Sequence, residues 1–293
     1  MSGAPVIFDR VAVRRARDRA AAGFADVDFL FREAGDRLLE RLGDVTRTFA
    51  AALDLSAGRS GLAGRLPAAH TVHADLSPAM VARAPAPRLC ADEEWLPFAD
   101  KSFDLVVSVL SMHWVNDLPG SLIQINRAMQ PDGLFTAVLA GGETLTELRQ
   151  CLTRAESESR GGAAPRVSPM TDVRDVGGLL QRAGFAMPVA DTERLTVSYG
   201  DPLTLVRELR AMGGANALTD RERKPLRRDV LARALTLYRD RFGDGDGRVP
   251  VTVDLIFAAG WSPGPDQPKP KAPGSAKTRL ADALGTSEGR LPR

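Results

Sequence analysis

The sequence predicts a doubly wound α/β fold, in which helices cover both faces of a seven-stranded sheet. Five short apolar runs recur, at 49–55, 71–76, 88–93, 103–111 and 133–141. Segments with helical spacing separate most of them, at 58–66, 77–84 and 117–129, and 93–102 reads as a loop. Two further extended stretches follow at 187–199 and 249–261. Apolar strands that alternate with helices are typical of a parallel sheet buried on both faces.

The remaining segments predict helices around this sheet. Residues 1–49 read as helical, and further helices are expected at 143–160, at 171–183 with a stop at Gly184, at 202–212 and at 219–242. The tail is rich in Pro, Lys and Gly and is expected to be disordered. We therefore expect a helical segment at 1–49, a core at 50–200, a helical insertion at 201–248, a final strand at 249–262 and a disordered tail at 263–293.

Composition limits the classes of function. The 39 basic and 37 acidic residues give a net charge of +2, so the charge of the whole chain does not predict binding to nucleic acid or membranes. No apolar run reaches the roughly 18 residues of a membrane helix. Cys90 and Cys151 form no CxxC pair, which favours a reducing compartment. The first 24 residues lack the apolar stretch of a secretory signal and read as a surface helix, with an Arg-rich transit peptide as the alternative.

Carboxylates follow three of the predicted strands. Asp54 ends the first strand, Asp75 ends the second, and Asp92 and Glu93 follow the third. Ligands of open parallel sheets bind beyond the carboxyl ends of the strands. A carboxylate there can accept hydrogen bonds from ribose hydroxyls or from an adenine amine. Such residues can also simply cap the following helices, but three in series favour a nucleotide-like ligand.

The first turn, "ALDLSAGRS" (52–60), resembles a nucleotide-binding turn with fewer glycines. The usual form is D-x-G-x-G-x-G, and Ser56 and Ser60 stand where glycines are expected. If position 56 requires a positive φ, Ser56 is strained by about 1–2 kcal/mol. If it does not, the serine is harmless or supplies a hydrogen bond. Gly61, one position late, offers conformational freedom.

Longer motifs identify a family. The series "ALDLSAGRS", "ADLSPAM", "ADEEWLPFADKSFDLVVSVLSMHWVNDLP" and "MQPDGLF" resembles class I S-adenosylmethionine-dependent methyltransferases. Together with "IFDR", "GGETLTELR", "RAGF" and "VPVTVDLIFAAGW", it is similar to the mitochondrial complex I assembly factors that carry a methyltransferase fold and are described as arginine hydroxylases. The malonyl-carrier-protein O-methyltransferases are more distant. The resemblance covers nearly all of 7–261 and implies a Rossmann-like class I methyltransferase sheet.

The resemblance also implies the cofactor S-adenosyl-L-methionine and its contacts. The turn would hold the methionine side, Asp75 the ribose, Asp92 and the Glu93 backbone the adenine, and Ser111 the floor of the site. The full set of residues expected to bind the cofactor is Asp54, Ser56, Gly58, Asp75, Leu76, Asp92, Glu93 and Ser111. His113 and Trp114 would border the substrate, and His113 is the one weak candidate for a catalytic role.

Several functions remain open from the sequence. The chain is expected to be an enzyme that transfers a methyl group, or hydroxylates an arginine, on a protein substrate such as an iron–sulfur subunit of respiratory complex I. The alternative is a non-catalytic complex I assembly chaperone with a decayed cofactor turn. We expect the cytoplasm for a bacterial-type chain and the mitochondrial matrix for a eukaryotic one.

Two further sequence features, a possible iron site and a basic run, each have two interpretations. The sequence His73-x-Asp75, with His113, contains the residue types of a two-His-one-carboxylate iron site. Such sites usually lie in antiparallel barrels and Asp75 already has a ribose role, so we expect no metal. The run "RERKPLRR" (221–228) is expected to be a solvated helix face, or else a contact for an acidic partner.

Overall fold

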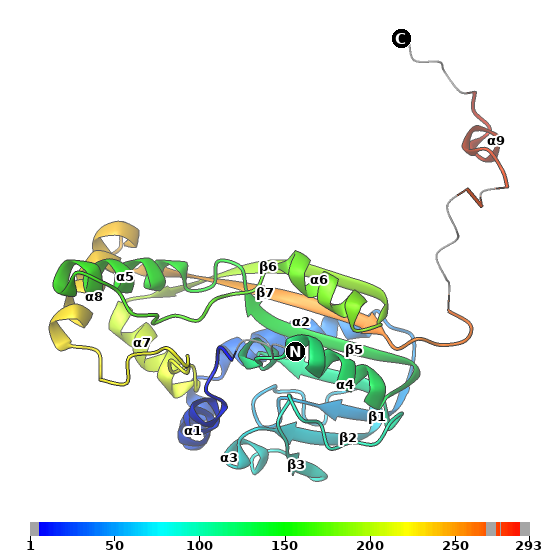
Figure 1. The fold of residues 1–293 in the computed structure, drawn as a ribbon, viewed down its shortest axis with the longest axis horizontal. Helices are drawn as coiled ribbons and strands as arrows, with labels where there is room; N and C mark the ends of the chain where they lie inside the picture. The colour runs from blue at the N-terminus through cyan, green and yellow to red at the C-terminus, as the bar shows by residue number, and fades with distance from the viewer. Residues whose placement is uncertain (1–5, 268–273, 276, 288–293) are drawn as a thin grey trace. The chain divides into compact units, whose positions relative to one another are not determined.

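The computed structural model describes residues 6–267, 274–275 and 277–287 (Figure 1). By its contacts the chain divides into Met1–Pro263, which contains the sheet, and Gly264–Arg293. The strands are β1 (Phe49–Asp54), β2 (Ala68–Asp75), β3 (Arg88–Cys90), β4 (Phe103–Val109), β5 (Met129–Gly141), β6 (Ala186–Tyr199) and β7 (Val249–Trp261). The helices are α1 (Arg10–Ala20), η1 (Ala21–Asp26), α2 (Phe29–Gly43), α3 (Pro78–Val81), η2 (Met112–Trp114), α4 (Leu118–Ala128), α5 (Thr146–Arg160), α6 (Val173–Arg182), α7 (Pro202–Ala211), α8 (Arg228–Phe242) and α9 (Leu280–Leu284).

The strands form a single sheet in the order β3-β2-β1-β4-β5-β7-β6. Strands β1 to β5 pair in parallel, and β7 runs antiparallel to both of its neighbours, β5 and β6. This confirms the predicted doubly wound fold, including a helical insertion, α7 and α8, before the last strand. All the parallel strands therefore end at one edge, where the sequence predicts the site.

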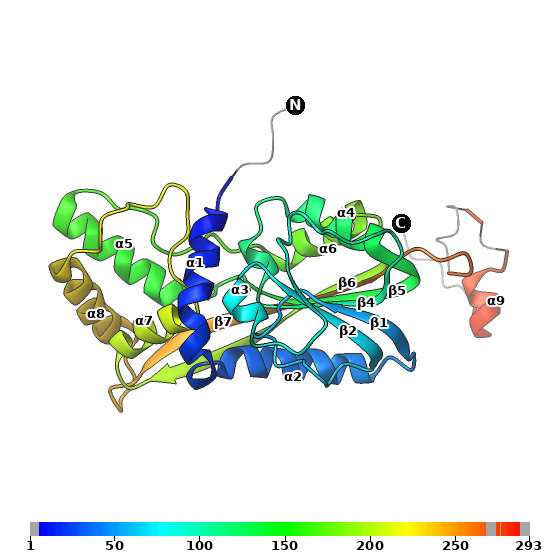
Figure 2. The ribbon, with the colours of Figure 1, turned by 90° about the horizontal axis from the view of Figure 1, so that it is seen from below.

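Two hydrophobic layers cover the sheet. Side chains alternate between its faces, so Leu105 and Val107 pack with α2, α5 and α8, whereas Leu53 and Val106 pack with α4 and α6. Figure 2 shows α2 along one face and α4 and α6 along the other. Strand β4 is buried along its whole length, as its unbroken apolar run predicts.

Two predicted helices differ from the structure. No helix forms over 58–66, because Gly58, Gly61 and Gly64 all take a positive φ, +73°, +69° and +72°, which interrupts helical backbone. The helix expected at 219–242 begins only at Arg228. Pro225 disfavours helical backbone at the residue before it, so 219–227 is irregular.

Other boundaries shift by a few residues. The third predicted strand ends at Cys90, which leaves Asp92 and Glu93 in the loop beyond it. Helix α6 ends at Arg182, and the predicted stop, Gly184, follows it with a φ of +84°. In the tail expected to be disordered, the described residues include the five-residue helix α9, and 268–273, 276 and 288–293 lie outside the described residues. Across the described part of the chain, no helix is both long and apolar enough to cross a membrane.

Helix α1 lies at the carboxyl edge of the sheet, held there by its N-terminal approach. The Asn116 side-chain oxygen accepts hydrogen bonds from the amides of Ile7 and Phe8, at 2.8 and 2.7 Å. Phe8 also pairs with Leu218 in an isolated bridge. Asp9 then caps the helix by accepting from the amide of Ala12. The first turn of α1 is thus fixed between the loop after β4 and the segment that precedes α8.

Candidate functional site

The predicted site residues Asp54, Asp75, Asp92, Glu93 and Ser111 gather at the carboxyl ends of β1 to β4, and we call this group the strand-end site. Four of the five side chains are almost fully buried, Asp54, Asp75, Glu93 and Ser111. The structure thus brings together the residues that the sequence selects. Their partners determine what the site can bind.

The turn after β1 closes on itself through its serines. The Ser56 hydroxyl donates to Asp54 Oδ1 at 2.9 Å and accepts from the amide of Val109 at 2.9 Å. The Ser60 hydroxyl donates to Asp54 Oδ2 at 2.8 Å. Ser56 has no positive φ, so of the two alternatives for this position the structure shows the hydrogen-bonded one, without strain.

Gly58 is required by the close packing of the turn against α3. A Cβ at Gly58 would lie 2.1 Å from the carbonyl oxygen of Met80, and its φ is +73°. The glycine therefore allows the turn to approach α3, the short helix that follows β2. In this arrangement it serves the packing of the turn against the protein itself.

Two buried arginines hold Asp75. Arg17, from α1, places Nη1 3.2 Å from Asp75 Oδ1, and Arg59, from the turn, places Nε 3.0 Å from Asp75 Oδ2. Both guanidinium groups donate to Ser111 Oγ at 3.0 Å. The amide of Ser77 also donates to Asp75 Oδ1 at 2.8 Å. Both oxygens of the residue expected to bind ribose are therefore engaged within the chain.

The two acidic residues after β3 are held in the same way. Glu93 accepts from Arg17 at 3.1 Å and also from Arg10 and Ser111. Arg10 forms a fork on Asp92, with Nη2 2.5 Å from Oδ1 and Nε 3.3 Å from Oδ2. Such bidentate pairs are the strongest type of guanidinium–carboxylate contact.

The network joins three guanidinium groups, of Arg10, Arg17 and Arg59, to the carboxylates of Asp75, Asp92 and Glu93. Arg10 also lies 3.5 Å from the carboxylate of Glu94. Burial raises the pKa of Glu93, but Arg17 and Arg10 outweigh it and bring the pKa down to about 2. Burial lowers the pKa of Arg17, but Asp75 and Glu93 outweigh it and raise that pKa. Burial lowers the pKa of Arg59, and the nearby charge of Arg17 acts in the same direction.

In this arrangement the strand-end site does not fit S-adenosylmethionine. A ribose would need the acceptor atoms of Asp75 that Arg17 and Arg59 occupy. Asp92, expected to accept from the adenine amine, is partly exposed and is shared with Arg10. The assignment of these residues, with Leu76, to a cofactor stays a prediction.

Sequence reasoning did not single out the three arginines. Arg10 lies within the quoted motif "IFDR" and Arg59 within the turn, but neither received a role. The available signal was the spacing of Arg10 and Arg17, which are seven residues apart and so lie on one face of a helix. That face points toward the carboxylates.

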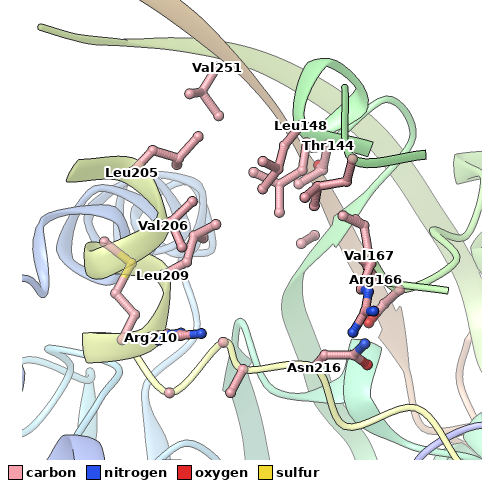
Figure 3. Close-up of a pocket in the computed structure, with 18 of the residues that line it drawn as sticks. Thr144, Leu148, Arg166, Val167, Leu205, Val206, Leu209, Arg210, Asn216 and Val251 are labelled. Carbon is pink, nitrogen blue, oxygen red and sulfur yellow. The ribbon is translucent and has the colours of Figure 1, made fainter. Parts of the chain in front are cut away.

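A cavity of about 590 Å³ adjoins the strand-end site. Arg17 and Arg59 form part of its wall, together with His113 and Trp114, the two residues expected to border a substrate. Figure 3 shows apolar side chains at one end of it and polar groups at the other; the former include Leu148, Leu205, Val206, Leu209 and Val251, and the latter Arg166, Arg210 and Asn216. The size and mixed lining are typical of small-molecule or side-chain binding pockets.

His113 is held as a neutral side chain. Its Nδ1 accepts a hydrogen bond from the amide of Ala140 at 3.4 Å. Burial lowers its pKa to about 3, and the charges of Arg17 and Arg59 act in the same direction. At neutral pH its Nε2 therefore carries the proton. A base this weak is poorly suited to accept a proton near pH 7.

The three residues of the alternative iron site are held by different partners. His73 Nδ1 lies 3.3 Å from Asp54 Oδ2, Asp75 is held by the arginines, and His113 contacts the backbone of β5. Among the residues that the structure describes, no group of three or more His, Cys, Asp or Glu side chains is arranged to hold a metal ion.

Comparisons with known proteins define the class. A family model described as "Methyltransferase domain" matches residues 53–137. The fold resembles the YcgJ protein of Bacillus subtilis, with a TM-score of 0.53 at 16% identity over 78% of this chain and 99% of that one. It also resembles Haemonchus contortus phosphoethanolamine N-methyltransferase 2, solved in complex with S-adenosyl-L-methionine, with a TM-score of 0.51 at 16% identity over 86% and 60% of the two chains. The chain is a class I methyltransferase-fold protein.

Curated relatives narrow this to a family. "Arginine-hydroxylase NDUFAF5, mitochondrial" of Danio rerio is 42% identical over 94% of this chain and 89% of its own length. The Homo sapiens protein of that name is 38% identical over 98% and 85%. A malonyl-[acyl-carrier protein] O-methyltransferase of Halorhodospira halophila is 39% identical over 88% and 89%. The chain belongs to the family of the arginine-hydroxylase NDUFAF5 proteins, within the methyltransferase superfamily of enzymes.

Proposed function

We propose that this chain modifies an arginine side chain of a protein substrate during assembly of respiratory complex I. The observation that carries the proposal is the 42% identity, over 94% of the chain, to a relative named as an arginine hydroxylase. An iron–sulfur subunit of complex I is the substrate that the resemblance implies.

The cavity supports access of a side chain from another protein. It lies beyond the carboxyl ends of the strands, and its walls come from α1, α5, α7 and β7. Its apolar end would accept the alkyl part of a side chain, and its polar end would orient the polar group. His113 lines this cavity, and its protonated Nε2 would act there as a hydrogen-bond donor.

Superfamily membership predicts S-adenosylmethionine as the cofactor, and the residues predicted to contact it are those of the strand-end site with Ser56, Gly58 and Leu76. Because that site does not fit the cofactor as arranged, no step of the modification is assigned to the cofactor. The closed site favours the second candidate function, a non-catalytic assembly factor. A matrix location would follow for a eukaryotic chain, and a cytoplasmic one for a bacterial chain.

Peptide mass spectrometry of complex I separates these functions. Complex I would be isolated from cells with and without the gene, and every arginine-containing peptide compared. We expect one arginine that gains the mass of one oxygen atom only when the gene is present. A gain of one methylene group would instead show methyl transfer. Normal arginine masses together with impaired assembly would establish the non-catalytic function, and normal assembly in the deletion strain would refute both.

A cavity-filling variant tests the assigned cavity in the same assay. Leu209→Trp places a large ring among the apolar residues of the cavity (Figure 3). Its matched control is Ile123→Trp on α4, a position that is 53% exposed and is not part of the cavity wall. We expect Leu209→Trp to abolish the arginine modification and Ile123→Trp to preserve it. Equal modification by the two variants would show that the substrate binds elsewhere.

A further inference from the structure

We propose that Arg17 and Arg59 take the place of S-adenosylmethionine in this chain: their guanidinium groups fill the strand-end site and exclude the cofactor. The inference goes beyond the proposed function, because it concerns what the site holds and not which protein is modified. It rests on the geometry of two buried side chains.

Both guanidinium groups lie inside the site and not at its mouth. Arg17 is 2% exposed and Arg59 is 3% exposed. Arg17 Nη1 bridges Asp75 Oδ1 and Glu93 Oε1 at 3.2 and 3.1 Å, while Arg59 Nε approaches Asp75 from the other oxygen. A planar guanidinium with several fixed donors matches two carboxylates in a way that an ammonium group cannot.

Entry of the cofactor would require these contacts to break. A ribose hydroxyl can bind Asp75 only where a guanidinium donates now, and moving Arg17 or Arg59 would leave charges unpaired in a buried site. Unpaired buried charge is strongly unfavourable. Ser111, the expected floor of the site, is occupied as well, since both arginines donate to its hydroxyl.

The elements that carry the arginines are tied to the rest of the fold by hydrogen bonds. Arg59 belongs to the turn that Ser56 and Ser60 tie to Asp54. Arg17 belongs to α1, whose approach is fixed by Asn116. Arg83, from the segment after α3, also donates to the Ala21 carbonyl at 2.7 Å, just beyond the end of α1. The turn with fewer glycines and the anchored helix thus together hold Arg59 and Arg17 in the strand-end site.

The test combines cofactor titration with chemical rescue of the full-length protein. Calorimetry would measure binding of S-adenosylmethionine to the wild type. Arg17→Ala removes one guanidinium, and its melting temperature would be followed with added methylguanidinium, or with methylammonium as the matched cation. Arg15→Ala, an exposed position on the same helix, is the control variant.

We expect no binding of S-adenosylmethionine to the wild type at millimolar concentration. We expect millimolar methylguanidinium to restore at least half of the melting-temperature loss of Arg17→Ala, and methylammonium to restore none. Arg15→Ala should lose little stability and respond to neither cation. If Arg17→Ala does not fold, Arg17→Lys, which keeps the charge without the fork, should fold with a lower melting temperature than the wild type.

Three results would overturn the inference. One is micromolar binding of S-adenosylmethionine to the wild type. Another is equal rescue of Arg17→Ala by both cations, or by neither. The third is an Arg17→Lys variant as stable as the wild type. The peptide masses of complex I would be unaffected by any of them, so the proposed function fails or survives separately.

Discussion

Glu93 makes the acid stability of this protein depend on one buried carboxylate. Its side chain is 1% exposed and contacts Arg10 and Arg17. Replacing it with glutamine, Glu93→Gln, removes the titrating group while keeping nearly the same shape. We expect the variant to be less stable than the wild type at neutral pH, and the difference to shrink as the pH falls.

The magnitude follows from the pKa of the Glu93 carboxyl. Burial raises that pKa, the two arginines lower it more, and it falls from 4.5 to about 2. A depressed carboxyl pKa contributes stability above the unfolded value of 4.5, and this stability is lost as the pH falls through the folded value. At about 1.4 kcal/mol per pH unit, the titration contributes about 3 kcal/mol at pH 7 and about 1.4 kcal/mol at pH 3.

Urea unfolding of both proteins across the acidic range would measure this. The difference between the two unfolding free energies follows the loss of the Glu93 carboxylate. That difference should fall by about 3 kcal/mol between neutral pH and about pH 2. Glu40→Gln, at an exposed position of α2, is the control and should show a difference near zero throughout. A wild-type-minus-Glu93→Gln difference that stays constant with pH would refute the reasoning.

Three other substitutions or titrations probe the site. Gly58→Ala should cost about 1–3 kcal/mol more than Gly64→Ala in chemical unfolding, since both have a positive φ but only the first meets a backbone oxygen; equal losses would argue against the close approach. Ser56→Ala should destabilise the fold by about 1–3 kcal/mol, because it leaves the buried amide of Val109 without its acceptor; a gain in stability would mean that the serine is strained after all. The imidazole of His113 should stay neutral from neutral pH down to about pH 4 in an NMR titration, as its lowered pKa of about 3 requires; a midpoint near its ordinary value would contradict the buried neutral state.

Much of the fold was predictable because its signal is local. The buried strand β4 is one unbroken apolar run, and Asp54 and Asp75 stand at strand ends that the pattern places at one edge. The helix expected at 58–66 was wrong because its apolar spacing concealed three glycines that adopt positive φ. The spacing of apolar residues indicates which side chains could share one face of a helix. It does not indicate whether the backbone stays helical.

The occupants of the site could not be predicted in the same way. Arg17 meets Asp75 and Glu93 across 58 and 76 positions of sequence, and no periodicity links residues so far apart. The two serines of the turn were recognised as departures, but their effect depended on the amide of Val109, which reaches Ser56 only in the folded sheet. Whether a replaced glycine weakens a turn or ties it together is decided by such tertiary partners.

The position of β7 has a consequence for synthesis of the chain. Strand β6 is joined to the rest of the sheet only through β7, which lies between it and β5 and is the last strand to be made. Until β7 has been made, the edges of β5 and β6 that pair with it lack their partner, and exposed strand edges promote association with other chains. The nascent protein therefore carries two incomplete edges from the completion of β6 at Tyr199 until β7 is complete at Trp261, and one late strand closes both.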